Sequence, residues 1–311
     1  MTDYRAMLRV FDLDTIPNLD IATLGALQLV AEEKVPKLDF SHLKRPLVIG
    51  SGNAFFTAQI LFDGVDAHFG DESTYGKELN TPSRFDGVVV LSASGKKHAI
   101  AMVEEAQKAH LETYLVTSTA DSDAAATLDE DHVFVFPKNR EPYTYNTSTY
   151  FAPIFGKTEE SATALSTYIE KDLSKKLLRN FADYEAYSFI IPSRFKYARA
   201  MLRTKFDELF GPMVVARVFT DEEVKHAKTV VESGRELFIS FGVENEHYGL
   251  GRNRLQLSLP KDLQYGGFLA VSYYVVGKIQ EAHPPYFARS VSKYTAVASQ
   301  IFKQNINPIV E

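Results

Sequence analysis

The stretch Gly87-Val-Val-Val-Leu-Ser-Ala-Ser-Gly95, followed by Lys96-Lys97-His98, decides the fold that the sequence predicts. Its four consecutive apolar residues, Val88 to Leu91, are typical of a short strand that is buried on both faces, as in a parallel sheet. From Lys97 to His110 the apolar side chains recur at helical spacing. The strand therefore ends in two serines and a glycine immediately before a helix begins.

A loop of this kind, between a strand and a helix, is a place where anions bind. Free backbone N–H groups and the positive end of the helix dipole point into it. The side chains of Ser92 and Ser94 are small, so each can add a hydrogen bond without blocking the ligand, and Gly95 has no side chain. We therefore expect the loop to hold a phosphate group. The alternative is an ordinary strand–helix turn in which a serine caps the helix.

The composition limits the classes of protein that the chain can represent. Its 311 residues suit two small domains or one large domain, and a hydrophobic content of 45% is enough for a full core. The net charge of −6 provides no basic field, so nucleic acid is not an expected partner. The absence of cysteine excludes disulfides, thiolate catalysis and cysteine metal sites, and it fits a cytoplasmic protein. The longest apolar run, from Phe268 to Val276, is too short to span a membrane.

Short apolar runs alternate with helical patterns along the chain. In the first half the expected strands recur at roughly 25-residue spacing with helices between them, which is typical of a parallel doubly wound sheet. In the second half, residues 214–219 fit a strand or a helix, and Thr220-Asp-Glu-Glu223 is a capping box that should open a helix. The expected strands are 46–49, 66–69, 87–91, 112–116, 132–136, 188–191, 237–241 and 255–259, and the expected helical stretches are 21–34, 54–62, 97–110, 146–183, 194–209, 268–281 and 290–304.

Hydroxyl side chains follow three of the expected strands of the first half: Ser51, then Ser92 and Ser94, then Thr117 and Ser118. Ligands of open α/β sheets bind at the carboxyl ends of the strands. A sugar-phosphate pocket would need hydroxyl groups at this edge, so we expect these side chains to form one.

The pair Gly50-x-Gly52, which follows the first strand, also suggests a dinucleotide-binding loop. Phe55, however, occupies the position of the third glycine in that fingerprint, and no clear ribose-binding acid follows a second strand. We therefore do not expect a nicotinamide cofactor.

The ordered set of motifs across residues 45–137 resembles the sugar isomerase (SIS) domain superfamily. The matching segments are Gly50-Ser51-Gly52-Asn53, Ser92-Ala-Ser94-Gly95, Leu115-Val-Thr117 and Ser122-Asp-Ala-Ala-Ala-Thr-Leu128. The resemblance implies two SIS-type α/β/α sandwich domains at 45–185 and 186–311, after an N-terminal helical segment at 1–44. Lys97 replaces the threonine of the family pattern. It would supply a full positive charge to a phosphate, or else be a solvated lysine.

The second half resembles the catalytic half of two-domain SIS isomerases, such as the bifunctional phosphoglucose/phosphomannose isomerases. Those proteins carry a Lys-x-x-Glu element followed by a Glu-x-x-His element, matched here by Lys205-Phe-Asp-Glu208 and Glu223-Val-Lys-His226. The resemblance implies that Glu208 transfers a proton between adjacent sugar carbons and that His226 opens the sugar ring. Lys293, or else Lys205, would stabilise the enediolate oxygen.

Each of these residues also has a purely structural explanation. Glu208 can pair with a lysine of its own helix, and Lys293 can be a solvated side chain. Glu223 is explained by its place in the capping box, and His226 by an ion pair with Glu223 one turn earlier. The polar stretch Glu244-Asn-Glu-His247 lacks a convincing third metal ligand and is expected to be a loop.

The sequence therefore predicts a two-domain α/β enzyme that interconverts the aldose and ketose forms of a phosphorylated sugar. We expect it to work without metal or organic cofactor, to be cytoplasmic and to form a homodimer. The resemblance implies that each active site would take His226 of the partner subunit. The alternatives are a sugar-phosphate sensor without catalysis and a structural protein on an SIS scaffold.

Overall fold

The computed structural model describes residues 2–96 and 98–311, and the chain divides into two compact units. The first-sheet unit comprises residues 32–138 and 148–159, and the second-sheet unit comprises residues 1–31, 139–147 and 160–311. The N-terminal residues thus group with the second sheet in this division. The domain boundaries expected at 44/45 and 185/186 describe parts of the chain that fold independently. A division into compact units does not test this, so these boundaries stay a prediction.

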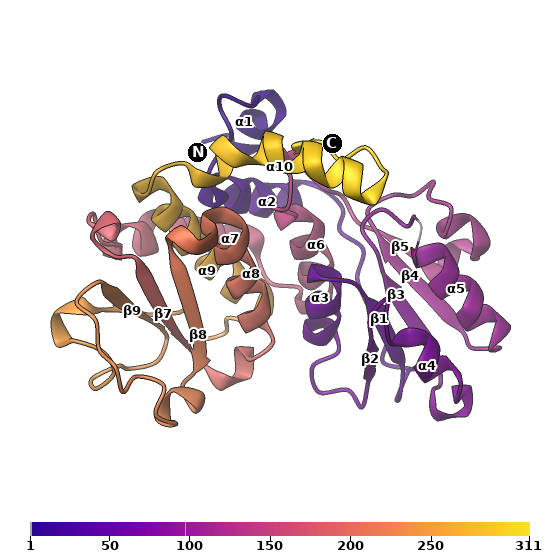
Figure 1. Cartoon of the computed structure of the whole chain (residues 1–311). Helices are drawn as coiled ribbons and strands as arrows, with labels where there is room; N and C mark the ends of the chain where they lie inside the picture. The colour runs from indigo at the N-terminus through magenta and orange to yellow at the C-terminus, as the bar shows by residue number, and fades with distance from the viewer. Residues whose placement is uncertain (1, 97) are drawn as a thin grey trace. The chain divides into compact units, whose positions relative to one another are not determined.

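The first-sheet unit is built on five parallel strands, as the spacing of the apolar runs predicts (Figure 1). Their order is β2-β1-β3-β4-β5, and the order changes direction between β1 and β3. Every residue of β3 is buried, which is why this strand is continuously apolar. The strands are β1 (Leu47–Gly50), β2 (His68–Gly70), β3 (Val88–Leu91), β4 (Thr113–Thr117) and β5 (Val133–Val135).

Helices cover both faces of the first sheet (Figure 1). On one face, Val88 and Val90 pack with Met102 and Val103 of α5 in a buried cluster. Helix α4 lies on the same face, and α3 and α6 lie on the other. Three short 3₁₀ turns connect the elements. The bounds are α3 (Asn53–Leu61), α4 (Tyr75–Leu79), η1 (Pro82–Arg84), α5 (His98–Lys108), η2 (Ala125–Thr127), η3 (Glu130–His132) and α6 (Thr147–Thr158).

The second-sheet unit is built on four parallel strands in the order β10-β9-β7-β8. The ring of Phe189 packs on Phe206 of α8, and Phe241 packs on Phe268 of α9, so both helices cover one face of the sheet (Figure 1). The ambiguous residues 214–219 form strand β8. The elements are β7 (Ala186–Ile191), α8 (Ala198–Phe210), β8 (Val215–Thr220), β9 (Glu236–Phe241), β10 (Arg254–Leu257) and α9 (Tyr265–Ala282).

The helix expected after Thr220 is wrong: the chain makes a single 3₁₀ turn there, η9 (Glu223–Lys225). The capping box itself is present, because the Thr220 N–H donates to Glu223 Oε2 at 3.0 Å and the Glu223 N–H donates to Thr220 Oγ1 at 3.1 Å. Val224 of this turn packs with Ile190 and Phe238 on the face opposite α8. The apolar residues that continue the helical spacing, Val230 and Val231, are 77% and 82% exposed. A helix start signal whose apolar residues find no surface to pack on thus produces one turn here.

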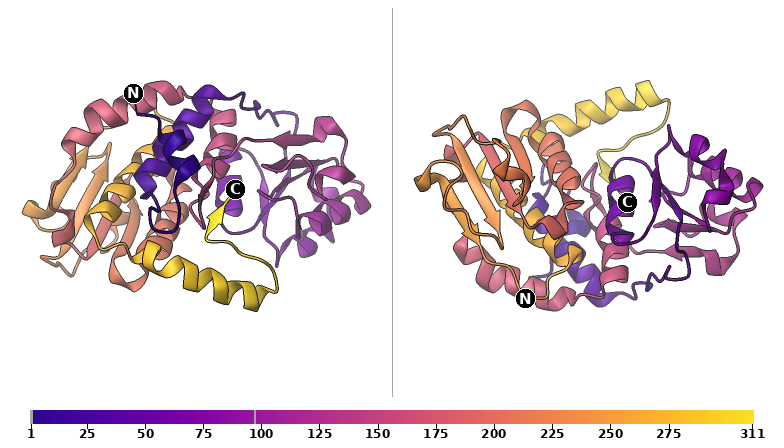
Figure 2. Two further views of the ribbon diagram at one scale, coloured as in Figure 1. Left: turned by 90° about the horizontal axis from the view of Figure 1, so that it is seen from above. Right: turned by 90° about the horizontal axis from the view of Figure 1, so that it is seen from below.

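Further helices and a small ribbon complete the second-sheet unit. Figure 2 shows how the yellow C-terminal segment turns back after α10 and ends in β11, which pairs with β6 in antiparallel fashion. The remaining elements are α1 (Tyr4–Val10), α2 (Leu19–Glu32), β6 (Glu141–Pro142), α7 (Ala162–Tyr168), the π-helix η4 (Ile169–Leu173), η5 (Ser174–Lys176), η6 (Phe181–Asp183), η7 (Ser193–Phe195), η8 (Gly211–Met213), η10 (Gly251–Asn253), α10 (Tyr286–Phe302) and β11 (Ile309–Val310). Among the described helices, none is both long enough and apolar enough to cross a membrane.

Candidate functional site

The predicted phosphate-binding loops meet at one edge of the first sheet. Strands β1, β3 and β4 are parallel neighbours, so the loops after Gly50, Leu91 and Thr117 emerge at the same carboxyl edge. The first two of these loops flank the point where the strand order changes direction. In open α/β sheets this is where ligands bind.

Hydrogen bonds tie the loop after β3 to the loop after β4. The hydroxyl of Thr117 and the N–H of Ser118 both donate to the Ala93 carbonyl, at 3.2 and 3.0 Å. Within the loop the Gly95 N–H donates to Ser92 Oγ at 3.2 Å. Since the Ser92 hydroxyl is used there as an acceptor, its proton stays available for a ligand.

Gly95 allows this close packing. Its φ is +59°, and a Cβ at this position would lie 2.1 Å from Ser122 Oγ and 2.5 Å from Ser122 Cβ. Only glycine meets both conditions, so the glycine of the motif is required by the backbone here.

The enclosed space beneath these loops is small. Ser92, Thr117 and Ser118 line a pocket of about 20 Å³, which is room for about one water molecule. A phosphate at this edge would therefore lie over the loops rather than beneath them. Ser94 and Gly52 are exposed, whereas Ser51 and Asn53 are half-buried. Lys97 lies outside the described residues.

Three polar residues of this pocket were not among the predicted site residues: Thr57 on α3, and Thr149 and Tyr150 on α6. Thr57 lies one helical turn after Asn53, so its place on the same helix face could have been expected from spacing. Thr149 and Tyr150 belong to a hydroxyl-rich run that opens α6, which is the only sequence signal for them.

A second candidate site lies in the second-sheet unit, around Glu208 on α8. Lys205 Nζ lies 2.6 Å from Glu208 Oε2 and 2.6 Å from the Thr144 carbonyl oxygen. The Lys205 side chain is only 1% exposed, whereas that of Glu208 is 22% exposed. The buried lysine thus lies beneath the carboxylate and holds it in place. Both of the acceptors of its ammonium group belong to this chain.

The carboxylate of Glu208 lines a pocket of about 630 Å³, within the size range of small-molecule sites. The other lining groups are aromatic rings, aliphatic side chains, hydroxyls and one more acid. They come from the loop before α6, the end of α8 and the start of α10: Tyr143, Thr144, Asp207, Leu209, Phe210, Gly211, Pro212, Met213, Tyr286, Phe287, Ser290, Val291 and Tyr294. Rings that stack and hydroxyl or carboxylate groups that accept hydrogen bonds are suited to a polyol.

The wall of this pocket contains a strained residue. Thr144 has φ +69°, which is unusual for a β-branched residue, and its buried Oγ1 has no hydrogen-bond partner. Strain of this kind is held only where the surroundings fix it, and it gathers at functional sites. Next to it, burial together with the charges of Tyr294 and Glu208 raises the pKa of Tyr143. The Tyr143 hydroxyl therefore stays protonated at neutral pH, as an ordinary tyrosine does, and can donate a hydrogen bond.

The other two predicted catalytic residues are not among those that line this pocket. His226 is exposed at the end of η9 and is not among the residues that line the pocket. Lys293 is exposed on α10, although its neighbours Ser290 and Tyr294 both line the pocket. Glu223 is held by Thr220 and by an ion pair with Arg199, which agrees with its expected role as a cap. Among the described residues no group of three or more histidine, aspartate or glutamate side chains is placed to hold a metal ion.

Comparison with solved structures supports the fold. The chain is similar to glucosamine-6-phosphate deaminase from Thermotoga maritima, with TM-score 0.60 and 14% identity over 84% of this chain and 92% of that chain. It is also similar to tagatose-6-phosphate ketose/aldose isomerase from Escherichia coli, with TM-score 0.55 and 13% identity over 92% of each chain. A third is the C-terminal domain of glucosamine-fructose-6-phosphate aminotransferase from Francisella tularensis, with TM-score 0.52 and 13% identity over 90% of this chain and 97% of that domain.

At these identities the similarity shows the fold alone. The chain shares with these proteins an α/β fold built on parallel sheets, which confirms the α/β fold class that the sequence predicts. No protein-family model and no curated protein matches the sequence.

Proposed function

We propose that the protein interconverts the aldose and ketose forms of a phosphorylated sugar through an enediol, without a metal or organic cofactor. The observation that carries the proposal is the position of Glu208, a fixed carboxylate in the wall of a pocket rich in aromatic and hydroxyl groups. The names of two of the similar proteins give tagatose 6-phosphate and glucosamine 6-phosphate as their substrates, which agrees with this substrate class.

In this proposal Glu208 takes the proton from one sugar carbon and returns it to the adjacent one. One carboxylate can reach both carbons if it is held still, and the ion pair with the buried Lys205 holds it. Because Lys205 already has two internal acceptors, we assign it to positioning Glu208 rather than to contact with the enediolate.

The remaining predicted residues keep their proposed roles. We assign phosphate binding to the edge of the first sheet, with Ser51, Gly52, Asn53, Ser92, Ser94, Gly95, Lys97, Thr117 and Ser118. Ring opening is assigned to His226 of the partner subunit in a cytoplasmic homodimer, and stabilisation of the enediolate to Lys293.

The first experiment replaces the base. Glu208→Gln keeps the shape and removes the basicity, so turnover of phosphosugars should fall by several orders of magnitude while binding persists. Glu223→Gln is the matched control, because that carboxylate caps a turn and should be dispensable for turnover. If Glu208→Gln stays active and Glu223→Gln does not, the assignment of the base is wrong.

The second experiment tests the shared site. Glu208→Gln and His226→Ala chains, each inactive alone, are unfolded and refolded together. Random pairing should give about half heterodimers, each with one intact site, and roughly a quarter of wild-type activity. Heterodimers without activity would place both residues in one chain's site.

A second function is favoured by one observation: the charge of Glu208 is already neutralised by Lys205. A protein that binds a sugar phosphate without turning it over would need no free base. A phosphosugar panel read by thermal shift and by turnover separates the two. Binding without turnover indicates the sensor, and binding with turnover the isomerase.

A further inference from the structure

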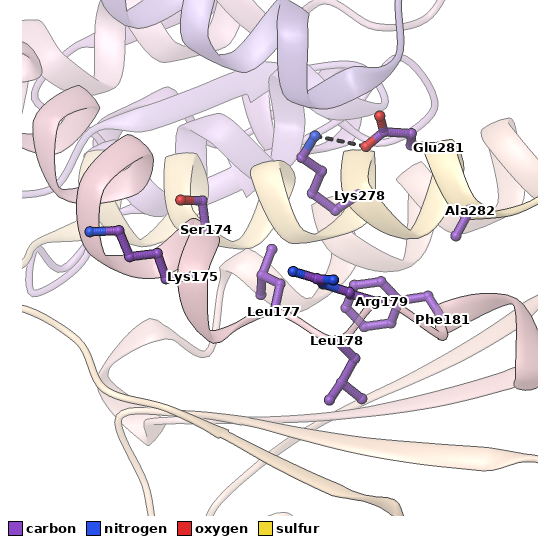
Figure 3. Close-up of a pocket in the computed structure, with 9 residues that line it drawn as sticks. All are labelled: Ser174, Lys175, Leu177, Leu178, Arg179, Phe181, Lys278, Glu281 and Ala282. Carbon is purple, nitrogen blue, oxygen red and sulfur yellow. Dashed lines mark hydrogen bonds and ion pairs between the residues drawn. The ribbon is translucent and has the colours of Figure 1, made fainter.

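A third pocket, of about 420 Å³, lies in the second-sheet unit and shares no lining residue with the pocket at Glu208 (Figure 3). One wall is the chain from Ser174 to Phe181, which follows the π-helix η4. The other wall is the last turn of α9, with Lys278, Glu281 and Ala282. π-Helical turns are rare and occur often at functional sites, so the segment that leaves this one is a reasonable place for a ligand.

The charges of this pocket are not balanced. Lys278 has two acidic partners, Glu281 at 2.7 Å and the buried Asp20 at 3.0 Å. Lys175 and Arg179 are exposed, and neither has an ion-pair partner among the described residues. The run from Ser174 to Arg179 carries three cations and no acid, in a chain whose net charge is −6. Two positive charges therefore border the pocket without a counter-charge.

The pocket also has an apolar floor. Figure 3 shows Arg179 between Leu177 and Phe181, with the ammonium of Lys278 turned toward Glu281. The side chain of Phe181 is 2% exposed, and Leu177 is half-buried. A ligand there would contact apolar surface beside a guanidinium.

We propose that this pocket binds a phosphate monoester with an apolar or aromatic body. The phosphate carries close to two negative charges at neutral pH and so matches both cations, whereas a carboxylate would leave one of them unmatched. Arg179 presents a planar fork that suits phosphate oxygens, and the flexible stem of Lys175 can bring its ammonium to the same group. The body of the ligand lies on Leu177 and Ala282, which are half-buried and line the pocket, with the buried Phe181 behind them.

Glu281 gives the proposal a second, opposite prediction. Its carboxylate is 58% exposed at the rim of the pocket and repels an incoming anion. Replacing it by glutamine should therefore strengthen binding, whereas replacing Arg179 or Lys175 should weaken it.

The test is a methyl NMR titration of the full-length protein with phenyl phosphate as the probe. The methyl signals of Leu177 and Leu178 report on this pocket alone, so phosphate bound at the first sheet does not interfere. We expect saturable shifts of these signals, with Arg179→Gln at least tenfold weaker than wild type and Glu281→Gln severalfold tighter. Lys176→Gln is the matched control, because Lys176 belongs to the same run but does not line the pocket. Its affinity should stay within threefold.

Each other outcome overturns the proposal. Absence of shifts at Leu177 and Leu178 removes the site. If benzoate binds as tightly as phenyl phosphate, the pocket does not recognise the phosphate group. If inorganic phosphate binds as tightly, the apolar body of the ligand contributes nothing. If Lys176→Gln lowers the affinity for phenyl phosphate as much as Arg179→Gln does, the probe is attracted only by the overall positive charge of this segment and not by a specific site. Arg179 is exposed, so its variant should keep the wild-type melting temperature, which a thermal scan checks.

Discussion

The two sheets of this protein share a strand order and differ in what lies at their carboxyl edges. Counted from its own first strand, the first four strands of each sheet have the order 2-1-3-4, because β8-β7-β9-β10 repeats the pattern of β2-β1-β3-β4, and the first sheet adds β5 at its end. The edge of the first sheet carries serines, of which Ser92 keeps its hydroxyl proton available, beside Thr117, whose hydroxyl donates to the Ala93 carbonyl. At the second sheet, the loop after β7 is closed by an acid: the Ser193 N–H and hydroxyl both donate to Asp221 Oδ1, at 2.9 and 2.5 Å.

This difference separates fold from function. An anion can approach the first edge, where the motif loops carry hydroxyls and backbone N–H groups, but Asp221 already occupies the corresponding loop of the second. The second-sheet unit places its candidate carboxylate elsewhere, on α8 beside a pocket. The same topology thus supports two kinds of site, and the loops decide which one is formed.

The largest effect is expected from a substitution at Gly95, which fills space at the carboxyl edge of the first sheet and so tests whether this edge differs from that of the second sheet. Gly95→Ala places a methyl group 2.5 Å from Ser122 Cβ at a positive φ, so we expect a loss of about 3 kcal/mol in the free energy of unfolding and weaker phosphate binding. Gly52→Ala is the matched control, since φ is also positive there but nothing lies within 4 Å of the new Cβ. It should cost less, about 2 kcal/mol, because only the backbone strain at φ +55° and ψ −123° remains. Urea unfolding measures both, and equal losses would contradict the packing argument.

The second prediction concerns the buried cation of the second-sheet unit. Lys205→Met should lower the free energy of unfolding by about 2 kcal/mol, because the Thr144 carbonyl and Glu208 both lose their donor. The loss is smaller than for a fully buried pair, since Glu208 is partly exposed and can be hydrated. Glu208→Gln should cost about 1 kcal/mol, because the amide oxygen still accepts from Lys205. A loss in Glu208→Gln larger than in Lys205→Met would reverse this order.

Much of the fold could be predicted because it depends on local pattern. A fully buried strand must be continuously apolar, so Val88–Leu91 could be recognised without its partners, and the regular spacing of strands and helices indicated parallel sheets. Residues 214–219 stayed ambiguous because a short apolar run suits either element until its neighbours are known. For the capping box at Thr220, the predicted hydrogen bonds are present but the predicted helix is not. The length of a helix depends on what it packs against, which the capping box does not reveal.

The sites were harder to predict, since they depend on contacts between distant parts of the chain. The motif loops of the first sheet are local and came together as parallel topology requires. The pocket at Glu208, however, takes Tyr143 from before α6 and Tyr294 from α10, and no spacing in the sequence relates these residues. The burial of Lys205 beneath Glu208 was likewise invisible, because a lysine three residues from a glutamate usually lies on the surface.

The third prediction sharpens the contrast between the two edges. Asp221→Ala removes the acceptor of two hydrogen bonds from Ser193, so it should lower the free energy of unfolding by about 1.5 kcal/mol. Ser51→Ala, at the loop after β1, should change it by less than about 0.5 kcal/mol, because the Ser51 hydroxyl makes no hydrogen bond among the described residues. The two variants are compared by thermal and urea unfolding. A large loss in Ser51→Ala would show that the first edge is as closed as the second.

The smallest expected effect depends on pH and concerns Glu223, the second acid near the edge of the second sheet. Burial alone would raise the pKa of Glu223, but the Thr220 N–H and the Arg199 guanidinium outweigh it and lower the pKa below its usual value of 4.5. The charged form is therefore favoured in the folded protein, and this contribution is complete above pH 4.5 and is lost as the pH falls through the lowered pKa. Because the side chain is 38% exposed, Glu223→Gln should cost only about 0.5 kcal/mol at pH 7.

Urea unfolding of wild type and Glu223→Gln at pH 7, 5.5, 4 and 3 measures this dependence. The difference between the two proteins should stay constant from pH 7 to 5.5 and shrink at pH 4 and 3. Glu222→Gln is the control, since that acid pairs with Lys225 on the open surface, with 65% of its side chain exposed, and should give little difference at any pH. A difference for Glu223→Gln that grows toward acid would mean that burial governs this carboxylate. The carboxylates at the edge of the second sheet would then lack sufficient hydrogen-bond and ion-pair partners, which would contradict the hydrogen bonds described for Asp221 and Glu223.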